Sequence, residues 1–122
     1  MAIWLLIAAI NGFLAVAFGA FAAHGLEGRV STTDLTIFET AVRYQMYHAM
    51  GLGLCAFAAD RPGMGRANDA GTLFTLGIIL FCGSLYLYSM FHWRPLVYVT
   101  PLGGLAFLAG WVMLGWAAYP KG

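Results

Sequence analysis

Residues 2–23 form a run of 22 residues without one charged side chain. A helix rises about 1.5 Å per residue and the apolar core of a bilayer is about 30 Å thick, so a run of this length is sufficient to cross it. A cleaved secretion signal has Lys or Arg before its apolar run, and none precedes this one. The segment is therefore predicted to be a membrane-spanning helix.

The rest of the chain has the same apolar character. Hydrophobic residues make up 61% of the 122 residues and charged residues 9%, whereas soluble domains carry roughly 25% charged residues. So few charges cannot cover the surface of a small soluble globule, and the lipid bilayer is the expected partner of that surface. The net charge is +1, and no run of Lys or Arg indicates a nucleic-acid partner.

Four apolar segments predict an all-α fold, an integral membrane bundle of four antiparallel transmembrane helices. The connections are short, which makes neighbouring helices antiparallel and favours a single domain over residues 1–122. The expected helices cover residues 2–23, 32–59, 69–91 and 101–119.

Helix-start signals set three of these boundaries. Ser31 is a suitable N-cap for the second helix, with Asp34 three positions later as in a capping box. Asn68 is the expected cap of the third helix. Thr100 followed by Pro101 predicts the cap and first position of the fourth.

Four spans place both termini on one side of the membrane, and we call the opposite side the far edge. Cytoplasmic loops carry an excess of Lys and Arg. Here the excess on the terminal side is one residue, and Arg43 near the far edge cancels it. We favour cytoplasmic termini in a multi-pass protein of the cell membrane.

Small residues recur at helical spacing on three of the predicted helices. In lipid, helices associate where small side chains let backbones approach closely. The predicted packing residues are Gly12, Ala15, Gly19, Gly51, Ala106 and Gly110. They either pack inside one bundle, or one stripe faces outward and binds another protein.

Several polar residues gather at the far edge, where His24 ends the first helix. Glu39 and Arg43 lie four residues apart at the start of the second, which suits an ion pair. Three interpretations remain open: an interfacial cap that satisfies helix ends and lipid phosphates, a site for a small molecule, lipid or proton, and a patch that docks a partner.

His48 lies deeper in the second helix, four residues after Tyr44. It could ligate a haem or another metal, but no second ligand lies at a matching depth. The alternative is a neutral imidazole hydrogen-bonded to Tyr44 or to a neighbouring helix. Asn11, midway along the first helix, is expected to bond across to another helix, with Ser84 as a candidate partner.

The two cysteines, Cys55 and Cys82, differ in predicted depth by roughly 12 Å. A disulfide needs Cα atoms within about 7 Å, so the two are not expected to pair. No zinc spacing, phosphate loop or catalytic triad is visible. We therefore expect no enzyme, metal or cofactor.

Four motifs resemble one family across nearly the whole chain: "GFLAVAFGAFAAHGL", "FETAVRYQMYHAMGL", "FCGSLYL" and "VTPLGGLAFLAGW". This is the domain-of-unknown-function 423 family, YgdD-like small bacterial inner-membrane proteins related to eukaryotic transmembrane protein 256. The chain departs from the family pattern at Ala22, which replaces a glycine. The resemblance implies four spans in a bacterial inner membrane and no chemistry. Its motif residues map onto Gly19, His24, Gly25, Glu39, Tyr44, His48, Gly83, Ser84, Thr100, Pro101 and Gly103.

Two function classes follow from these features. The first is a non-enzymatic accessory or interaction subunit of a larger membrane complex, or a homo-oligomer, favoured by small size and abundant small-residue faces. The second is a carrier or binder of an ion, lipid or metabolite. Its candidate ligand or partner residues are His24, Glu39, Arg43, Tyr44 and His48.

Overall fold

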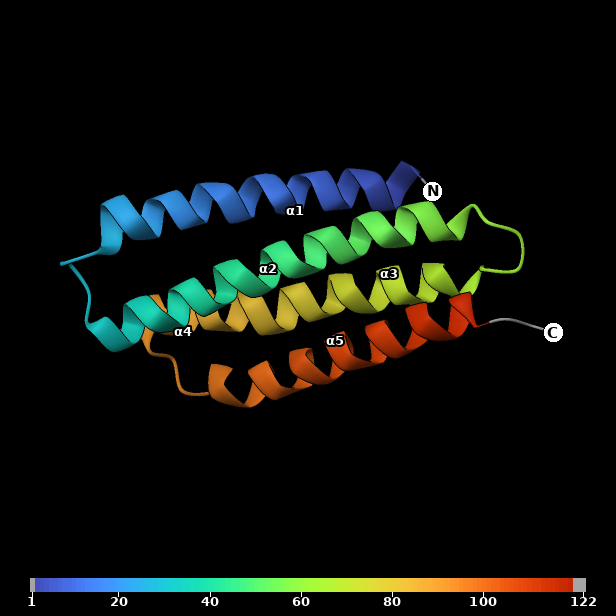
Figure 1. The fold of residues 1–122 in the computed structure, drawn as a ribbon. Coiled ribbons are helices and arrows are strands. Elements are labelled where there is room, and N and C mark those ends of the chain that lie inside the picture. The colour runs from blue at the N-terminus through green and yellow to red at the C-terminus, as the bar shows by residue number, and fades with distance from the viewer. Residues whose placement is uncertain (1, 120–122) are drawn as a thin grey trace.

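The computed structural model describes residues 2–119, and every regular element in that range is helical (Figure 1). Two of the elements are single π-helical turns, η1 and η2, which continue the helices on either side of them. The elements are α1 (Ala2–Phe21), η1 (Ala22–Leu26), α2 (Thr32–Ala59), α3 (Arg66–Gly77), η2 (Ile78–Cys82), α4 (Gly83–Phe91) and α5 (Leu96–Ala118). The α3–η2–α4 segment forms one rod, so four rods lie side by side.

The α2 helix has the expected bounds, and its start follows from the capping signal. The Ser31 side chain accepts a hydrogen bond of 3.0 Å from the backbone N–H of Asp34. This bond satisfies one of the free amides of the first turn, which explains why the helix begins at Thr32. The carboxylate of Asp34 contacts His92, at the end of α4, rather than the cap.

The predicted start of the third helix is wrong. The α3 helix begins at Arg66, with Gly65 as its N-cap, so Asn68 lies inside the first turn and does not cap it. The Asn68 side chain instead accepts a hydrogen bond of 2.7 Å from Nε1 of Trp4, on α1. The Asn68 side chain therefore bonds to Trp4 on another helix, whereas the local sequence predicted that it would cap α3.

The predicted start of the fourth helix is also wrong. The α5 helix begins at Leu96, directly after Pro95, and includes Pro101. The fixed φ of Pro95 suits a helix start, and the missing N–H of Pro101 removes one backbone bond to the preceding turn. The hydroxyl of Thr100 bonds back to the Leu96 carbonyl, inside the helix, instead of capping it.

Each π-helical turn widens the helix locally. The first turn, η1, contains His24 and extends the predicted first helix to Leu26. The second, η2, brings the backbone of Phe81 against α5 at Gly103. A Cβ at Gly103 would lie 2.3 Å from the Phe81 nitrogen, so only glycine fits there.

The packing of the four rods is uneven. The α1 helix packs mainly on α2, and α5 packs mainly on the α3–η2–α4 rod, which lies between α5 and α2. The main core cluster joins α2, the third rod and α5 around Leu52, Cys55, Phe74 and Phe107. Because α2 and α5 touch each other little, a groove remains between them.

Three stretches among residues 2–119 are long and apolar enough to cross a membrane. They are Ile3–Leu26, Arg66–Phe91 and Leu96–Ala118. The α2 helix is long enough, at 28 residues and about 42 Å, but it is less apolar. Length and composition therefore support three of the four expected spans.

Candidate functional site

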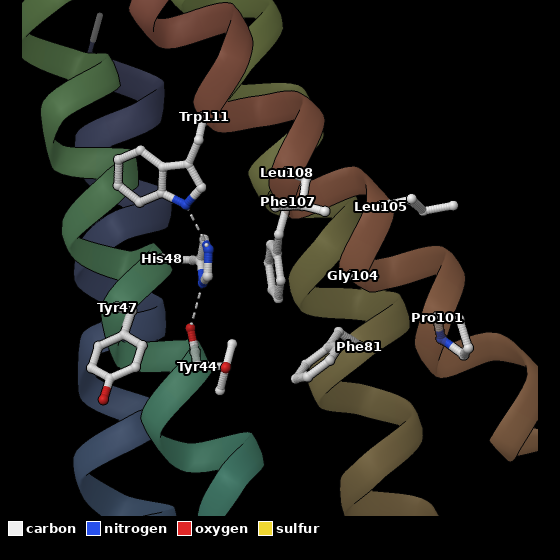
Figure 2. A pocket seen from close by; sticks show the side chains of 10 residues that line it. All are labelled: Tyr44, Tyr47, His48, Phe81, Pro101, Gly104, Leu105, Phe107, Leu108 and Trp111. Atoms are coloured by element: carbon white, nitrogen blue, oxygen red, sulfur yellow. Dashed lines mark hydrogen bonds between the residues drawn. The ribbon is translucent and has the colours of Figure 1, made fainter.

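A groove with a volume of about 800 Å³ lies between α2 and α5 (Figure 2). Phe81 of η2 forms part of its floor. Its walls are mostly apolar and aromatic, and the lining residues are Tyr44, Tyr47, His48, Phe81, Pro101, Gly104, Leu105, Phe107, Leu108 and Trp111. We call it the α2–α5 groove.

His48 lies on the inner wall of the groove and is 4% exposed. Its Nδ1 lies 2.7 Å from the Tyr44 carbonyl oxygen, and its Nε2 lies 3.0 Å from Nε1 of Trp111. A carbonyl only accepts and an indole N–H only donates, so Nδ1 carries the proton and Nε2 is the acceptor. The imidazole is therefore neutral, and neither nitrogen is free to bind a metal.

Aromatic rings hold this imidazole in place. The ring of Phe107 stacks on it with centroids 3.6 Å apart and planes 7° from parallel, and Phe74 meets its edge. Two glycines make room for this packing: a Cβ at Gly77 would lie 2.3 Å from the Phe107 ring, and one at Gly110 would lie 2.6 Å from the Phe74 ring. The expectation of a neutral, hydrogen-bonded histidine is confirmed.

A second polar chain joins three rods. The Tyr86 hydroxyl donates to Oε1 of Gln45 at 2.6 Å, and Nε2 of Gln45 donates to Oδ1 of Asn11 at 2.9 Å. The expected bond between Asn11 and Ser84 is wrong, because Ser84 contacts Thr100 on α5. The signal for Gln45 was available: it is an amide inside a stretch predicted to cross the bilayer, where a polar group needs a partner.

The far-edge residues do not converge. His24 is exposed in η1, and Arg43 is exposed on α2, where it donates to the Thr40 hydroxyl at 3.2 Å. No hydrogen bond or ion pair in residues 2–119 joins His24, Glu39 and Arg43 to one another. The expected Glu39–Arg43 pair is therefore absent from the described residues.

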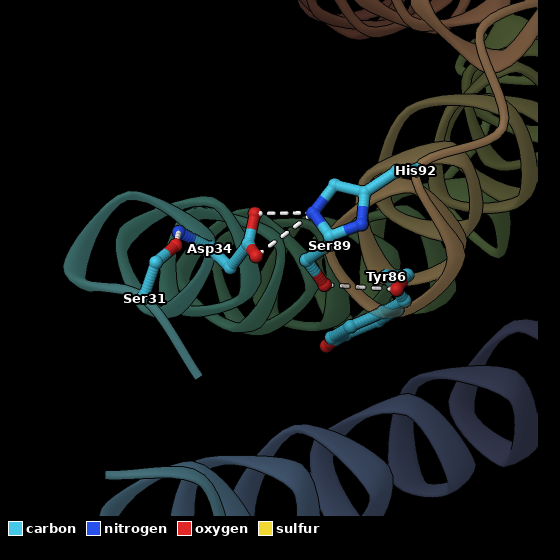
Figure 3. Close-up of polar contacts among 5 residues, drawn as sticks. All are labelled: Ser31, Asp34, Tyr86, Ser89 and His92. Atoms are coloured by element: carbon cyan, nitrogen blue, oxygen red, sulfur yellow. Dashed lines mark hydrogen bonds and ion pairs between the residues drawn. The ribbon is translucent and has the colours of Figure 1, made fainter. Parts of the chain in front are cut away.

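The polar contact between α2 and α4 at this edge involves other residues (Figure 3). Nε2 of His92 lies 2.8 Å from Oδ2 of Asp34, which joins the end of α4 to the start of α2. His92 has a left-handed backbone, with φ of 56°, and this conformation ends α4. The sequence pattern did not pair these residues, because they lie 58 positions apart.

The predicted packing residues lie in different surroundings. Ala15 is buried, and a Cβ at Gly19 would contact Val42 at 3.3 Å, so both belong to the α1–α2 contact. Gly51 and Gly110 lie against Phe74, and Ala106 is half-buried on α5. Gly12 differs, because a Cβ there would have nothing within 4 Å.

Both cysteines are free and buried in the main core cluster. Within residues 2–119, no three His, Cys, Asp or Glu side chains are grouped so that they could hold a metal ion.

Comparison with known proteins places the chain in a family. Residues 18–104 match the family described as "Protein of unknown function (DUF423)". The chain is 47% identical over 119 residues to the UPF0382 membrane protein YwdK of Bacillus subtilis, with 97% of each chain covered. It is 37% identical over 110 residues to the UPF0382 inner membrane protein YgdD of Escherichia coli, covering 90% of this chain and 84% of that one. No solved structure matches. The match over most of the chain and these identities establish that the protein belongs to the DUF423 family of membrane proteins.

Proposed function

We propose that this chain is a non-enzymatic interaction protein of the bacterial inner membrane, built as four antiparallel transmembrane helices. Three stretches meet the requirements for a span. The less apolar α2 is the second rod, with α1 on one side and the α3–η2–α4 rod on another. Its polar Gln45 and His48 are both 4% exposed and meet protein rather than lipid, which supports a crossing by α2 as well.

The state of the polar groups supports a non-enzymatic role. Catalysis needs a group free to reach a substrate. In the spanning region His48 is bonded through both nitrogens, and Gln45 through both ends of its amide. Ser84 is bonded to Thr100, across to α5. These bonds join helices to one another and leave none of these groups available for a reaction.

A small-residue surface on α1 and α2 carries the proposal of an interaction role. A Cβ at Gly12 or at Gly53 would have nothing within 4 Å. Both glycines line a hollow of about 400 Å³, whose other lining residues are Leu5, Ala8, Ala9, Met46, Ala49, Met50 and Leu54. We call it the α1–α2 face. Glycines with open space beside them allow a helix of another membrane protein to approach closely.

The orientation is part of the same proposal, with both termini in the cytoplasm. A cysteine introduced at Gly63, in the loop between α2 and α3, reports it, because the native Cys55 and Cys82 are buried. In intact cells, a membrane-impermeant maleimide should leave this cysteine unlabelled and should label it only after the membrane is opened. Labelling in intact cells would show that this loop lies outside the cytoplasm and would refute the proposed orientation.

The interaction role is tested by native mass spectrometry after mild detergent extraction from native membranes. The unaltered protein should carry a stoichiometric protein partner, either a second copy or another chain. Gly53→Leu fills the α1–α2 face and should remove the partner. Gly115→Leu is the control, because this exposed α5 glycine also has open space around its Cβ. A protein without a stoichiometric partner, or a partner kept by Gly53→Leu, would refute the role.

A further inference from the structure

We propose that the α2–α5 groove binds one acyl chain of an anionic phospholipid, whose phosphate group lies against Arg43. This site is separate from the α1–α2 face, because it is built from α2, η2 and α5. The inference rests on the membrane placement of the chain and is independent of its protein partner.

The shape and lining of the groove suit an acyl chain. Its volume of about 800 Å³ lies within the roughly 300–1,000 Å³ typical of small-ligand sites. Gly104 keeps one wall flat, since the nearest atoms to a Cβ there would be in the Phe81 ring at 3.8 Å. Leu105 and Leu108 border the same space. This part of the groove offers an acyl chain apolar contact.

Arg43 provides the charge that selects the headgroup. It is exposed, and its guanidinium donates to Thr40, while no carboxylate among the described residues pairs with it. It lies four residues before Tyr47, so the two share a helix face and Arg43 is about 6 Å nearer the far edge. An unpaired guanidinium at this depth can bind a phosphate in a bidentate manner.

Two phenol groups lie between the charge and the apolar floor. Tyr44 and Tyr47 are 37% and 53% exposed, and their rings lie 5.6 Å apart. Neither hydroxyl bonds to a described residue, and Figure 2 shows the Tyr47 hydroxyl directed along α2 toward its N-terminal turns. An unpaired hydroxyl in an apolar medium is unfavourable, so an acceptor beside these two phenols would stabilise a bound molecule.

This order of groups favours a phospholipid over a protein helix. In a phospholipid the ester carbonyls lie between the phosphate and the chains, so they can accept hydrogen bonds from Tyr44 and Tyr47. Each carbonyl of a transmembrane helix already accepts a bond from one of its own amides, whereas the ester carbonyls have no donor within the lipid molecule. Along α2, the guanidinium, the two phenols and the apolar groove thus follow one another in the same order as the phosphate, the ester groups and the acyl chain of a phospholipid.

The test uses the full-length protein in detergent, with phosphatidylglycerol as the probe and native mass spectrometry as the measurement. We expect Arg43→Gln to weaken binding about tenfold, which is about 1.4 kcal/mol. The control Arg29→Gln removes the same charge from the exposed loop between η1 and α2 and should keep the affinity. Equal affinities of the two variants would overturn the role of Arg43.

The groove is tested separately with Gly104→Leu, whose side chain occupies the position of the acyl chain. It should also lose about tenfold in affinity, whereas Gly115→Leu, outside the groove, should not. If Gly104→Leu loses its helical circular dichroism, Leu108→Trp is used instead. Leu108 lines the same groove one turn further along α5, and the larger side chain should fill it. Unchanged lipid binding in a folded groove-filling variant would overturn the proposal, as would a copurified polypeptide that leaves when the groove is filled. Gly53→Leu lies outside this groove and should still bind the lipid. The lipid proposal can therefore be judged even if the proposed protein partner is refuted.

Discussion

Trp111 donates its indole N–H to Nε2 of His48 across 3.0 Å, and this bond joins α5 to α2 beside the Phe107 ring, which stacks on the same imidazole. The bond, together with the Tyr44 carbonyl on Nδ1, sets the tautomer of a buried histidine. The same histidine residue in sequence alone is compatible with metal ligation. In the structure this histidine instead joins α2 to α5 through a hydrogen bond.

Replacing Trp111 with Phe should destabilise the protein by about 1–3 kcal/mol, because Nε2 of His48 would remain buried without its donor. Reversible unfolding in mixed detergent measures the change in free energy. Trp93→Phe is the control, since this loop side chain is 63% exposed. Equal stability of the two variants would show that the bond contributes nothing.

The tautomer itself is open to direct measurement. Nitrogen NMR of the labelled protein should show His48 with a protonated Nδ1 and an unprotonated Nε2. In Trp111→Phe the Nε2 signal should move, because its hydrogen-bond donor is gone. A protonated Nε2 in the unaltered protein would contradict the assignment.

Two adjacent glycines give a matched pair of substitutions on α5. Gly103→Ala places a Cβ 2.3 Å from the backbone nitrogen of Phe81, which cannot move without shifting η2. We expect a loss of about 1–3 kcal/mol, as for other overpacked sites. Gly104→Ala places its Cβ no closer than 3.8 Å to the same residue and should change stability little. Thermal unfolding of both variants in one detergent compares them, and similar midpoints would refute the close approach of η2 to α5.

The chain of bonds through Gln45 should be cooperative. Gln45→Leu leaves the Tyr86 hydroxyl without its acceptor and Oδ1 of Asn11 without its donor, at an expected cost of about 1–2 kcal/mol. Adding Tyr86→Phe should cost less in the Gln45→Leu background than in the unaltered protein, because the bond is already lost. A double-mutant cycle from unfolding free energies measures this coupling, and strictly additive effects would contradict the network.

The cap of α2 is the simplest local prediction. Ser31→Ala removes the acceptor of the Asp34 amide and should cost about 1 kcal/mol. Thr33→Ala changes an exposed hydroxyl in the same turn that makes no hydrogen bond in the described structure, and it serves as the control. Hydrogen exchange of the first-turn amides should rise in Ser31→Ala alone; exchange equal to that of the control would exclude the cap.

Local sequence signals succeeded where a single helix decides the outcome. The start of α2 follows from Ser31, because an N-cap acts within one turn. The same kind of signal failed at Asn68 and Thr100, where a side chain found another partner: Trp4 for Asn68, and the Leu96 carbonyl and Ser84 for Thr100. A cap signature states what a residue can do and does not exclude a tertiary contact.

The candidate site was only partly predictable for the same reason. His48 and Tyr44 stood out as polar or aromatic residues on one face of a helix, but Trp111 and Phe107 come from a helix more than 50 residues away. Their contact depends on how far α5 is shifted along α2 and on its rotation about its axis. No periodicity within one helix encodes either quantity.

The sequence by itself determined the surrounding medium and the helical fold class, because apolar run length and the scarcity of charge are sums over neighbouring residues. Only the tertiary structure decided which glycines have a side chain of another helix packed against them and which, such as Gly12, have open space beside them. It also decided the bonding of the buried polar groups. These outcomes depend on the relative placement of separate helices, which is set by side-chain packing between segments far apart in the chain.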